Sequence, residues 1–266
     1  MTWSEIRQAE PQRIKFMVQS VHNVLPSPAN LHLWGMVDSP ACALCSKKGS
    51  LEHILSCCPK ALGEGRYRWR HDQVLKTIAE AIFTAVARRN KQQQQGRRNI
   101  AFVRAGEQPQ PQPKQAAGFL TSAVDWDLQV DLGKQLKFPE HVTATSLRPD
   151  IVLSSVASRQ VLLLELTVPW EDRMVEANER KRSKYQELVE LCQTRGWKAR
   201  CEPIEVGCRG FAGRSLCRVL TLLGITGQEK RRAIKSTTEA AERASRWLWI
   251  RRNDLWDRAT GTQVGA

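Results

Sequence analysis

Residues 148–185 read RPDIVLSSVASRQVLLLELTVPWEDRMVEANERKRSKY. Two apolar runs of strand length flank a short polar segment that can turn the chain back on itself. If Ala157 and Ser158 form this turn, counting outward along both runs places Asp150 directly opposite Glu165. Cross-strand partners have Cβ atoms about 5 Å apart. The stretch therefore predicts a hairpin that holds two carboxylates close together.

A pair of carboxylates at this spacing is suited to Mg²⁺, which prefers oxygen ligands and keeps several waters. Such an ion polarises a phosphate and lowers the pKa of a bound water. Lys181 and Lys184 lie in the apolar stripe of the helix expected after the hairpin, so both should point towards the sheet. Thr167 shares a strand face with Glu165, where a nuclease lysine would complete the site. A structural ion pair is the competing interpretation.

The remaining pattern predicts an α/β fold whose core is a mixed sheet of about four strands flanked by helices. Alternating residues over 124–132 indicate a half-buried strand. One long helix is expected over 171–195, ending near Gly196. The other expected elements are strands at 149–155, 161–168 and 197–206, a broken amphipathic stretch at 4–34, and helices at 65–89, 213–223 and 228–252.

Composition divides the chain into four segments. Residues 90–117 are rich in Gln, Pro and Arg, which predicts a flexible, extended linker. Residues 1–89 before it should hold helices and a cysteine cluster, and residues 118–225 after it the α/β core. Residues 226–266 should form a basic helix and a tail.

The cysteine cluster lies in residues 42–58. Cys42 and Cys45 form a Cys-x2-Cys knuckle, and His53 and Cys58 follow at the start of a helical segment. Zn²⁺ takes four such ligands at tetrahedral corners. Cys57 is an alternative fourth ligand, since on a helix it has almost the same direction from His53. The spacing predicts a structural zinc site, with ordinary buried thiols as the alternative.

The net charge of +14 and the isoelectric point near 9.8 favour a polyanionic partner, mainly nucleic acid or an anionic membrane. The sequence contains no run of about 18 apolar residues, so no membrane-spanning helix is expected. The first residues show no basic-then-apolar signal pattern. The eight cysteines are therefore expected to be reduced, in a nuclear or cytoplasmic protein. The candidate nucleic-acid contacts are Arg148, Arg209, Arg66 and Arg70.

Together these residues resemble the C-terminal region of site-specific non-LTR retrotransposon proteins that carry a restriction-like endonuclease. In that family a Cys-Cys-His-Cys zinc knuckle follows the reverse transcriptase and precedes a nuclease domain of the PD-(D/E)xK class. The family also moves its lysine from the strand to the next helix, which implies Lys181 as the catalytic lysine and Lys184 as a close alternative. The matching motifs are Cys42, Cys45, His53 and Cys58; Arg148-Pro149-Asp150; Glu165; and Lys181-Arg182-Ser183-Lys184-Tyr185.

The resemblance implies a metal-dependent endonuclease that nicks a DNA strand by phosphodiester hydrolysis. Asp150 and Glu165 would hold catalytic Mg²⁺, and the knuckle would hold structural Zn²⁺. No reverse transcriptase motif is present, so a separate reverse transcriptase or the rest of a polyprotein is an expected partner beside DNA or RNA. His71 and His141 are not expected as bases, because neither sits in a matching motif.

Two other functions fit the same sequence. One is a zinc-containing, nucleic-acid-binding remnant of a retrotransposon protein that no longer catalyses. The other is a protein-interaction or membrane-surface module that acts through the basic C-terminal helix. The endonuclease remains the expected function, without a membrane partner, because the hairpin register and the helix phase bring the acidic pair and the lysines together.

Overall fold

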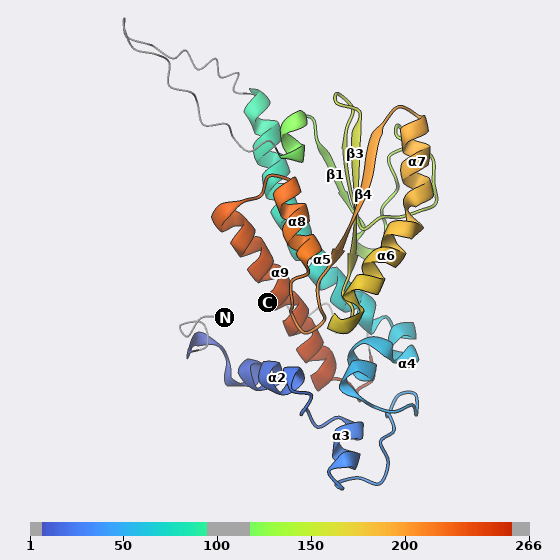
Figure 1. The fold of residues 1–266 in the computed structure, drawn as a ribbon, viewed down its shortest axis with the longest axis vertical. Helices are drawn as coiled ribbons and strands as arrows, with labels where there is room; N and C mark the ends of the chain where they lie inside the picture. Colours follow the sequence, from blue (N-terminus) through green and yellow to red (C-terminus); the bar gives the residue numbers. More distant parts are fainter. Residues whose placement is uncertain (1–6, 95–117, 257–266) are drawn as a thin grey trace, which may run out of the picture.

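The computed structural model describes residues 7–94 and 118–256 (Figure 1). Its centre is one four-stranded sheet in the order β1-β2-β3-β4. β2 pairs antiparallel with both β1 and β3, and β4 runs parallel to β3. The expected mixed sheet is therefore confirmed. The strands are β1 (Asp127–Val130), β2 (Ile151–Ser155), β3 (Gln160–Thr167) and β4 (Lys198–Glu205).

The β2–β3 hairpin has the register that its sequence predicts, with Ile151 opposite Leu164. The side chain of Asp125 fixes the turn, because it accepts hydrogen bonds from Ser155 Oγ at 2.6 Å and from the Ala157 amide at 2.8 Å. Asp125 thereby leaves the strand ladder. This explains why β1 is shorter than the expected strand at 124–132.

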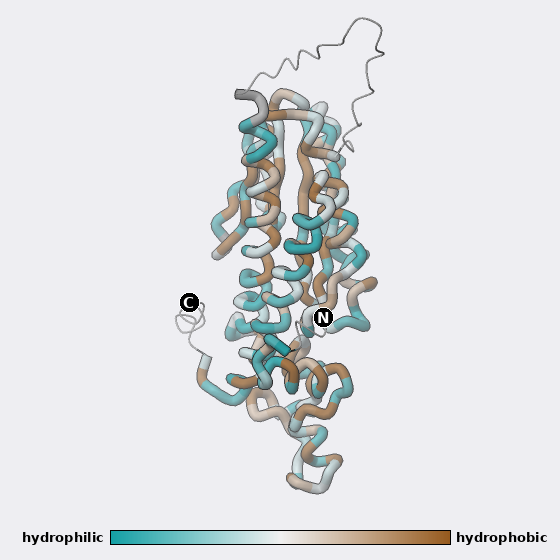
Figure 2. Tube along the Cα trace, turned by 90° about the vertical axis from the view of Figure 1, so that its left-hand side faces the viewer, coloured by the Kyte–Doolittle hydropathy of each residue, from teal (hydrophilic) through white to brown (hydrophobic). Residues whose placement is uncertain are grey.

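Helices cover both faces of the sheet, so the fold has three layers (Figure 1). On β3, Leu162, Leu164 and Leu166 pack in one apolar cluster and Val161 and Leu163 in another. Strands buried on both faces read as continuous apolar runs, and Figure 2 shows hydrophobic stretches along the strands. The first cluster faces α5 (Arg66–Gln94), α8 (Arg214–Leu222) and α9 (Gly227–Ile250), and the second faces α6 (Met174–Lys184) and α7 (Gln186–Thr194).

The N-terminal segment packs onto the same core. Phe16, Leu51 and Leu55 are buried in the cluster that also contains the apolar residues of α5 and α9. The short elements of the fold are α2 (Pro11–Val21), α3 (Pro28–Leu33), the π-helical turn η1 (His53–Cys57), α4 (Pro59–Gly63), and the 3-10 turns η2 (Phe119–Ser122), η3 (Leu132–Lys134) and η4 (Glu171–Arg173).

The single helix expected over 171–195 is wrong, because the chain breaks at Tyr185. Tyr185 has φ −103° and ψ 4°, outside the helical region. Its ring is fully buried in the second apolar cluster, and its hydroxyl donates to the Arg148 carbonyl at 2.9 Å. This hydrogen bond ties the break between α6 and α7 to the segment just before β2. The predicted linker falls largely outside the described residues, since α5 continues to Gln94 and residues 95–117 are not described.

We expect Gly213→Ala to destabilise the fold. Gly213 is the N-cap residue of α8, and its amide donates to the Glu205 carbonyl at 3.0 Å. An added Cβ would overlap that carbonyl oxygen. The α8–β4 connection must then shift, at a cost of about 1–3 kcal/mol in the free energy of unfolding. Gly63→Ala is the control, because nothing lies within 4 Å of its added Cβ. Urea unfolding measures both, and equal stabilities of the two variants would contradict this close approach.

Candidate functional site

Asp150 and Glu165 meet at the end of the β2–β3 hairpin, as the register predicts. The Asp150 amide donates to Glu165 Oε2 at 3.1 Å. The Leu166 amide donates to Asp150 Oδ2 at 2.8 Å. Both carboxylates are buried, with 4% and 2% of their residue surfaces exposed. Charged groups in such surroundings need partners, because burial alone disfavours the ionised form.

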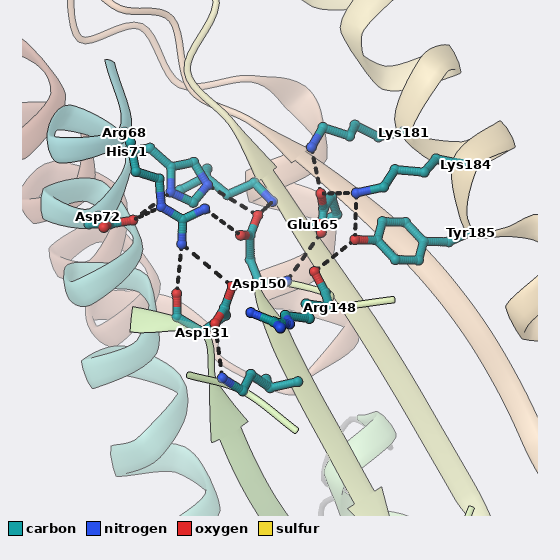
Figure 3. A network of polar contacts seen from close by, with 12 residues as sticks. Arg68, His71, Asp72, Asp131, Arg148, Asp150, Glu165, Lys181, Lys184 and Tyr185 are labelled. Carbon is teal, nitrogen blue, oxygen red and sulfur yellow. Dashed lines mark hydrogen bonds and ion pairs between the residues drawn. The ribbon is translucent and has the colours of Figure 1, made fainter. Parts of the chain in front are cut away.

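Helix α6 supplies two of these partners, and Figure 3 shows them converging on Glu165. Lys181 Nζ donates to Glu165 Oε1 at 2.5 Å. Lys184 Nζ lies 3.6 Å from the same oxygen and donates to the Tyr185 hydroxyl at 2.9 Å. Both lysines therefore point towards the sheet, as their helical phase predicts, and Lys181 makes the closer contact.

Helix α5 supplies a histidine that sequence reasoning set aside. His71 Nε2 lies 3.1 Å from Asp150 Oδ2, and its Nδ1 lies 3.0 Å from Asp72 Oδ1. The imidazole thus bridges two carboxylates from different parts of the chain (Figure 3). The signal that could have found it is a polar cluster one turn into an otherwise apolar helix. His141 lies elsewhere, with its ring 5.6 Å from that of Trp197.

Arg68 joins the same network from the preceding turn of α5. Its guanidinium lies 2.8 Å from Asp72 Oδ1 and donates to the Asp131 carbonyl at 2.9 Å. It also lies 3.5 Å from Asp131 Oδ2 and 4.0 Å from Asp150 Oδ1. The site is therefore an array in which carboxylates alternate with cationic side chains, and its residues come from α5, the sheet and α6.

The array holds its charges ionised. Burial lowers the pKa of His71, but its hydrogen bonds to Asp150 and Asp72 raise it more, to about 9. Burial raises the pKa of Asp150, but the hydrogen bond and charge of His71, the Leu166 amide and Lys181 bring it below its usual value. At neutral pH an imidazolium therefore faces a carboxylate.

The acidic pair lines a cleft of about 530 Å³ between α6, the hairpin and the start of α5. Thr167 lines it too, and its buried Oγ1 has no hydrogen-bond partner among the described residues. The walls carry an excess of positive charge. The cationic lining residues are Arg68, Arg70, Arg148, Arg173, Arg180, Lys181 and Lys184.

Arg66, Arg70 and Arg209 make contacts within the fold. Arg66 is 2% exposed and donates to the carbonyls of Arg251 and Asp254. Arg70 is equally buried and donates to the carbonyl of Leu55 in η1 and to the carbonyl of Val168 just after β3. Arg209 pairs with Glu171 at 2.7 Å. Each of the three guanidinium groups therefore already has partners within the protein.

The cysteine-histidine cluster lies beside α4 and α5. The ligand atoms of Cys42, Cys45, His53 and Cys58 all lie within 4.8 Å of one another, so the cluster could hold a metal ion. A tetrahedral zinc ion would separate its ligand atoms by roughly 3.3–3.8 Å. Cys57 is exposed, with its thiol directed to Glu52 at 3.9 Å. Cys58 is therefore the fourth member of the cluster.

The chemistry of these four donors fits Zn²⁺. Burial raises the pKa of Cys45, but the Lys47 amide and the neighbouring cysteines lower it more. Burial and Lys47 lower the pKa of His53, which favours the neutral imidazole that binds metal. Burial raises the pKa of Cys58 to about 11, so zinc must displace a proton there. The ion would fix the knuckle structurally, since all four positions are taken by protein.

Replacement of His71 by Gln should change how stability depends on pH. The charge of His71 stabilises the fold fully below its ordinary pKa of 6.5, and this contribution is lost as the pH rises through about 9. The free energy of unfolding of the native protein should fall by about 3 kcal/mol over that window. The Gln variant should show a flatter profile in urea unfolding without added Mg²⁺. Parallel profiles would show that the imidazolium is not stabilised by the two carboxylates.

Replacement of Cys58 by Ser should release zinc, whereas replacement of Cys57 by Ser should not. The two thiols are adjacent in sequence, but only Cys58 lies with the other three ligands. Native protein and Cys57→Ser should contain about one zinc ion per chain, and Cys58→Ser much less, with a lower melting temperature. Elemental analysis and thermal unfolding measure this. Equal zinc contents in the two variants would contradict the assignment.

Comparison with protein-family models finds no match for this chain, and no curated protein matches it either. Over residues 7–94 and 118–256, none of the helices has the length and apolar character needed to cross a bilayer. The roles of the acidic pair and of the cysteine-histidine cluster are therefore inferred from their own geometry.

Proposed function

We propose that this protein is a metal-dependent endonuclease that hydrolyses DNA phosphodiester bonds, with the cysteine-histidine cluster as its structural zinc module. The observation that carries the proposal is the meeting of Asp150, Glu165 and Lys181 in one cation-lined cleft. Two strands and a helix bring these groups together. The resemblance to retrotransposon endonucleases supports the same chemistry, and carries with it a nuclear location and a reverse transcriptase partner.

The oxygen donors of the cleft fit Mg²⁺. Asp150 and Glu165 would hold the ion. Asp150 Oδ1 lies 4.0 Å from Arg68, beyond hydrogen-bond distance, and the buried Thr167 Oγ1 has no hydrogen-bond partner in the described chain. Mg²⁺ supplies polarisation of the phosphate and a bound water of lowered pKa.

The other groups of the cleft have separate roles. His71 and the Leu166 amide hold Asp150 Oδ2, and so fix the orientation of that carboxylate. Lys181 places a positive charge beside Glu165, where it would stabilise negative charge that develops on the phosphate. Lys184 shares its contact with Tyr185, so Lys181 is the proposed catalytic lysine.

The walls of the cleft are suited to a phosphate backbone. Arg148, Arg173 and Arg180 line it around the acidic pair. Cations at this density attract a polyanion and make its binding strongly salt-dependent. They would hold the phosphates on either side of the scissile bond.

A second candidate function is non-catalytic nucleic-acid binding. The observation that favours it is that each carboxylate already has a cationic partner, His71 for Asp150 and Lys181 for Glu165. A network balanced in this way stays together without a metal. The zinc module and the basic cleft would then remain as the functional parts.

Nicking of supercoiled plasmid in Mg²⁺ separates the two functions. Asp150→Asn and Glu165→Gln should each reduce nicking by at least ~100-fold, the scale expected when one charge-stabilising group is lost. Asp127→Asn is the control. This exposed carboxylate lies on the same sheet, but it is opposite Ser154, at the end of β2 away from Asp150. Its nicking rate should match that of the native protein.

DNA binding is measured on the same variants by fluorescence anisotropy. Binding retained with nicking lost establishes the acidic pair as the catalytic site. Binding by the native protein, with no nicking in either Mg²⁺ or Mn²⁺, would overturn the endonuclease and favour the non-catalytic function. Lys181→Ala should reduce nicking more than Lys184→Ala.

A further inference from the structure

A second hollow lies between α5 and α9, away from the acidic pair. Its volume is about 460 Å³, and α5 and α9 pack along each other beside it (Figure 1). Helix α5 contributes Trp69, Gln73 and Lys76 to its lining, and α9 contributes Arg243 and Trp247 among others. We call this hollow the α5–α9 groove. None of the roles assigned above uses it.

The lining of the groove has more cations than acids. Lys76 and Arg243 are exposed and form no ion pair among the described residues. Arg246 is already balanced, because it pairs with Glu242 at 3.1 Å and lies 3.5 Å from Glu10. Glu80 is the acid among the lining residues. Lys76 and Arg243 therefore face this hollow without an ion-pair partner in the described chain, and the exposed Glu80 offsets one of their two charges.

The groove also has an aromatic and aliphatic wall. Trp247 is half-buried, with the Arg251 guanidinium 4.7 Å from its ring centre. Ile250, one turn further along α9, is 55% exposed. Large apolar side chains left in contact with solvent beside free cations are typical of a surface that receives both a planar apolar group and an anion.

The groove and the catalytic cleft share the first turns of α5. Arg68 lines the cleft, and the next residue, Trp69, lines the groove. Successive residues of a helix point about 100° apart, so the two hollows open on neighbouring sides of one helix. A strand that leaves the cleft past Arg68 would therefore reach the groove within a short distance.

We propose that the α5–α9 groove binds single-stranded nucleic acid, with phosphates at Lys76 and Arg243 and a base against Trp247. Bases in a duplex are stacked on each other, so their faces cannot reach an indole in a groove, whereas an unpaired base can. An acidic peptide would pair with the two cations, but it has no nucleobase to stack on the indole of Trp247. The inference rests on the nucleic-acid part of the proposed function and not on its cleavage step.

Binding of labelled single-stranded thymidine oligonucleotide and of a duplex of equal length tests this. The full chain is used without divalent ions and in the Asp150→Asn background, so that cleavage plays no part. Lys76→Ala/Arg243→Ala should weaken single-strand binding about 10-fold at low salt. It should also lower the slope of log Kd against log salt by about 1.4, the effect of losing two phosphate contacts to a single strand.

The matched control is Lys91→Ala/Arg232→Ala, which removes the same charge from the same two helices outside the groove. Its Kd should stay within about twofold of the parent value, so that general charge cannot explain the effect. Trp247→Leu keeps apolar volume and should weaken single-strand binding by about 5- to 150-fold, the range for one stacked base, with a smaller effect on duplex. Circular dichroism confirms that each variant is folded.

Three outcomes would overturn the inference. In one, the groove variant and its control weaken binding equally, which leaves only the overall charge. In another, Trp247→Leu changes single-strand and duplex binding by the same factor. In the third, poly-glutamate competes with the oligonucleotide as well as unlabelled DNA does. These measurements follow binding and not nicking. Failure of the groove inference can therefore be distinguished from failure of the proposed endonuclease function.

Discussion

The register of the β2–β3 hairpin is the constraint on which the site depends. Side chains alternate between the faces of a strand, so a shift by one residue would turn Glu165 into the apolar cluster under α5, α8 and α9. No lysine of α6 could then reach it. In the observed register Glu165 faces α6, Asp150 lies beside it, and each buried carboxylate meets a cation.

Helix α5 connects this hairpin to the zinc module. At its start, the Tyr67 hydroxyl accepts from the Cys58 amide at 3.0 Å and donates to the Ile54 carbonyl at 2.9 Å. One turn later, His71 contacts Asp150 at 3.1 Å. A metal held by the cluster would therefore fix the start of α5, and with it the position of the imidazole. The cysteine-histidine cluster could thus influence the cleft through α5, without lining the cleft itself.

The large positive charge of the chain is divided between two tasks. Arg66 and Arg70 are buried and bind backbone carbonyls, where a planar guanidinium with several donors can join distant segments. Other cations remain accessible, and some of these line the cleft and the α5–α9 groove, while Lys91 and Arg232 lie outside both. The positions of basic residues in the sequence therefore do not show which of them lie inside the fold and which are accessible to a partner.

The sequence by itself determined the four-stranded mixed sheet, the opposition of Asp150 and Glu165, and the direction of Lys181. Each follows from local periodicity: two residues in a strand, a short turn, and 3.6 residues in a helix. Tertiary structure alone decided that His71 meets Asp150, 79 residues away, and that Arg66 lies inside the fold. It also decided that the helix after β3 breaks at Tyr185, and that Cys58 joins the cluster instead of Cys57. These depend on which helix covers which face, and local periodicity carries no information about contacts between distant segments.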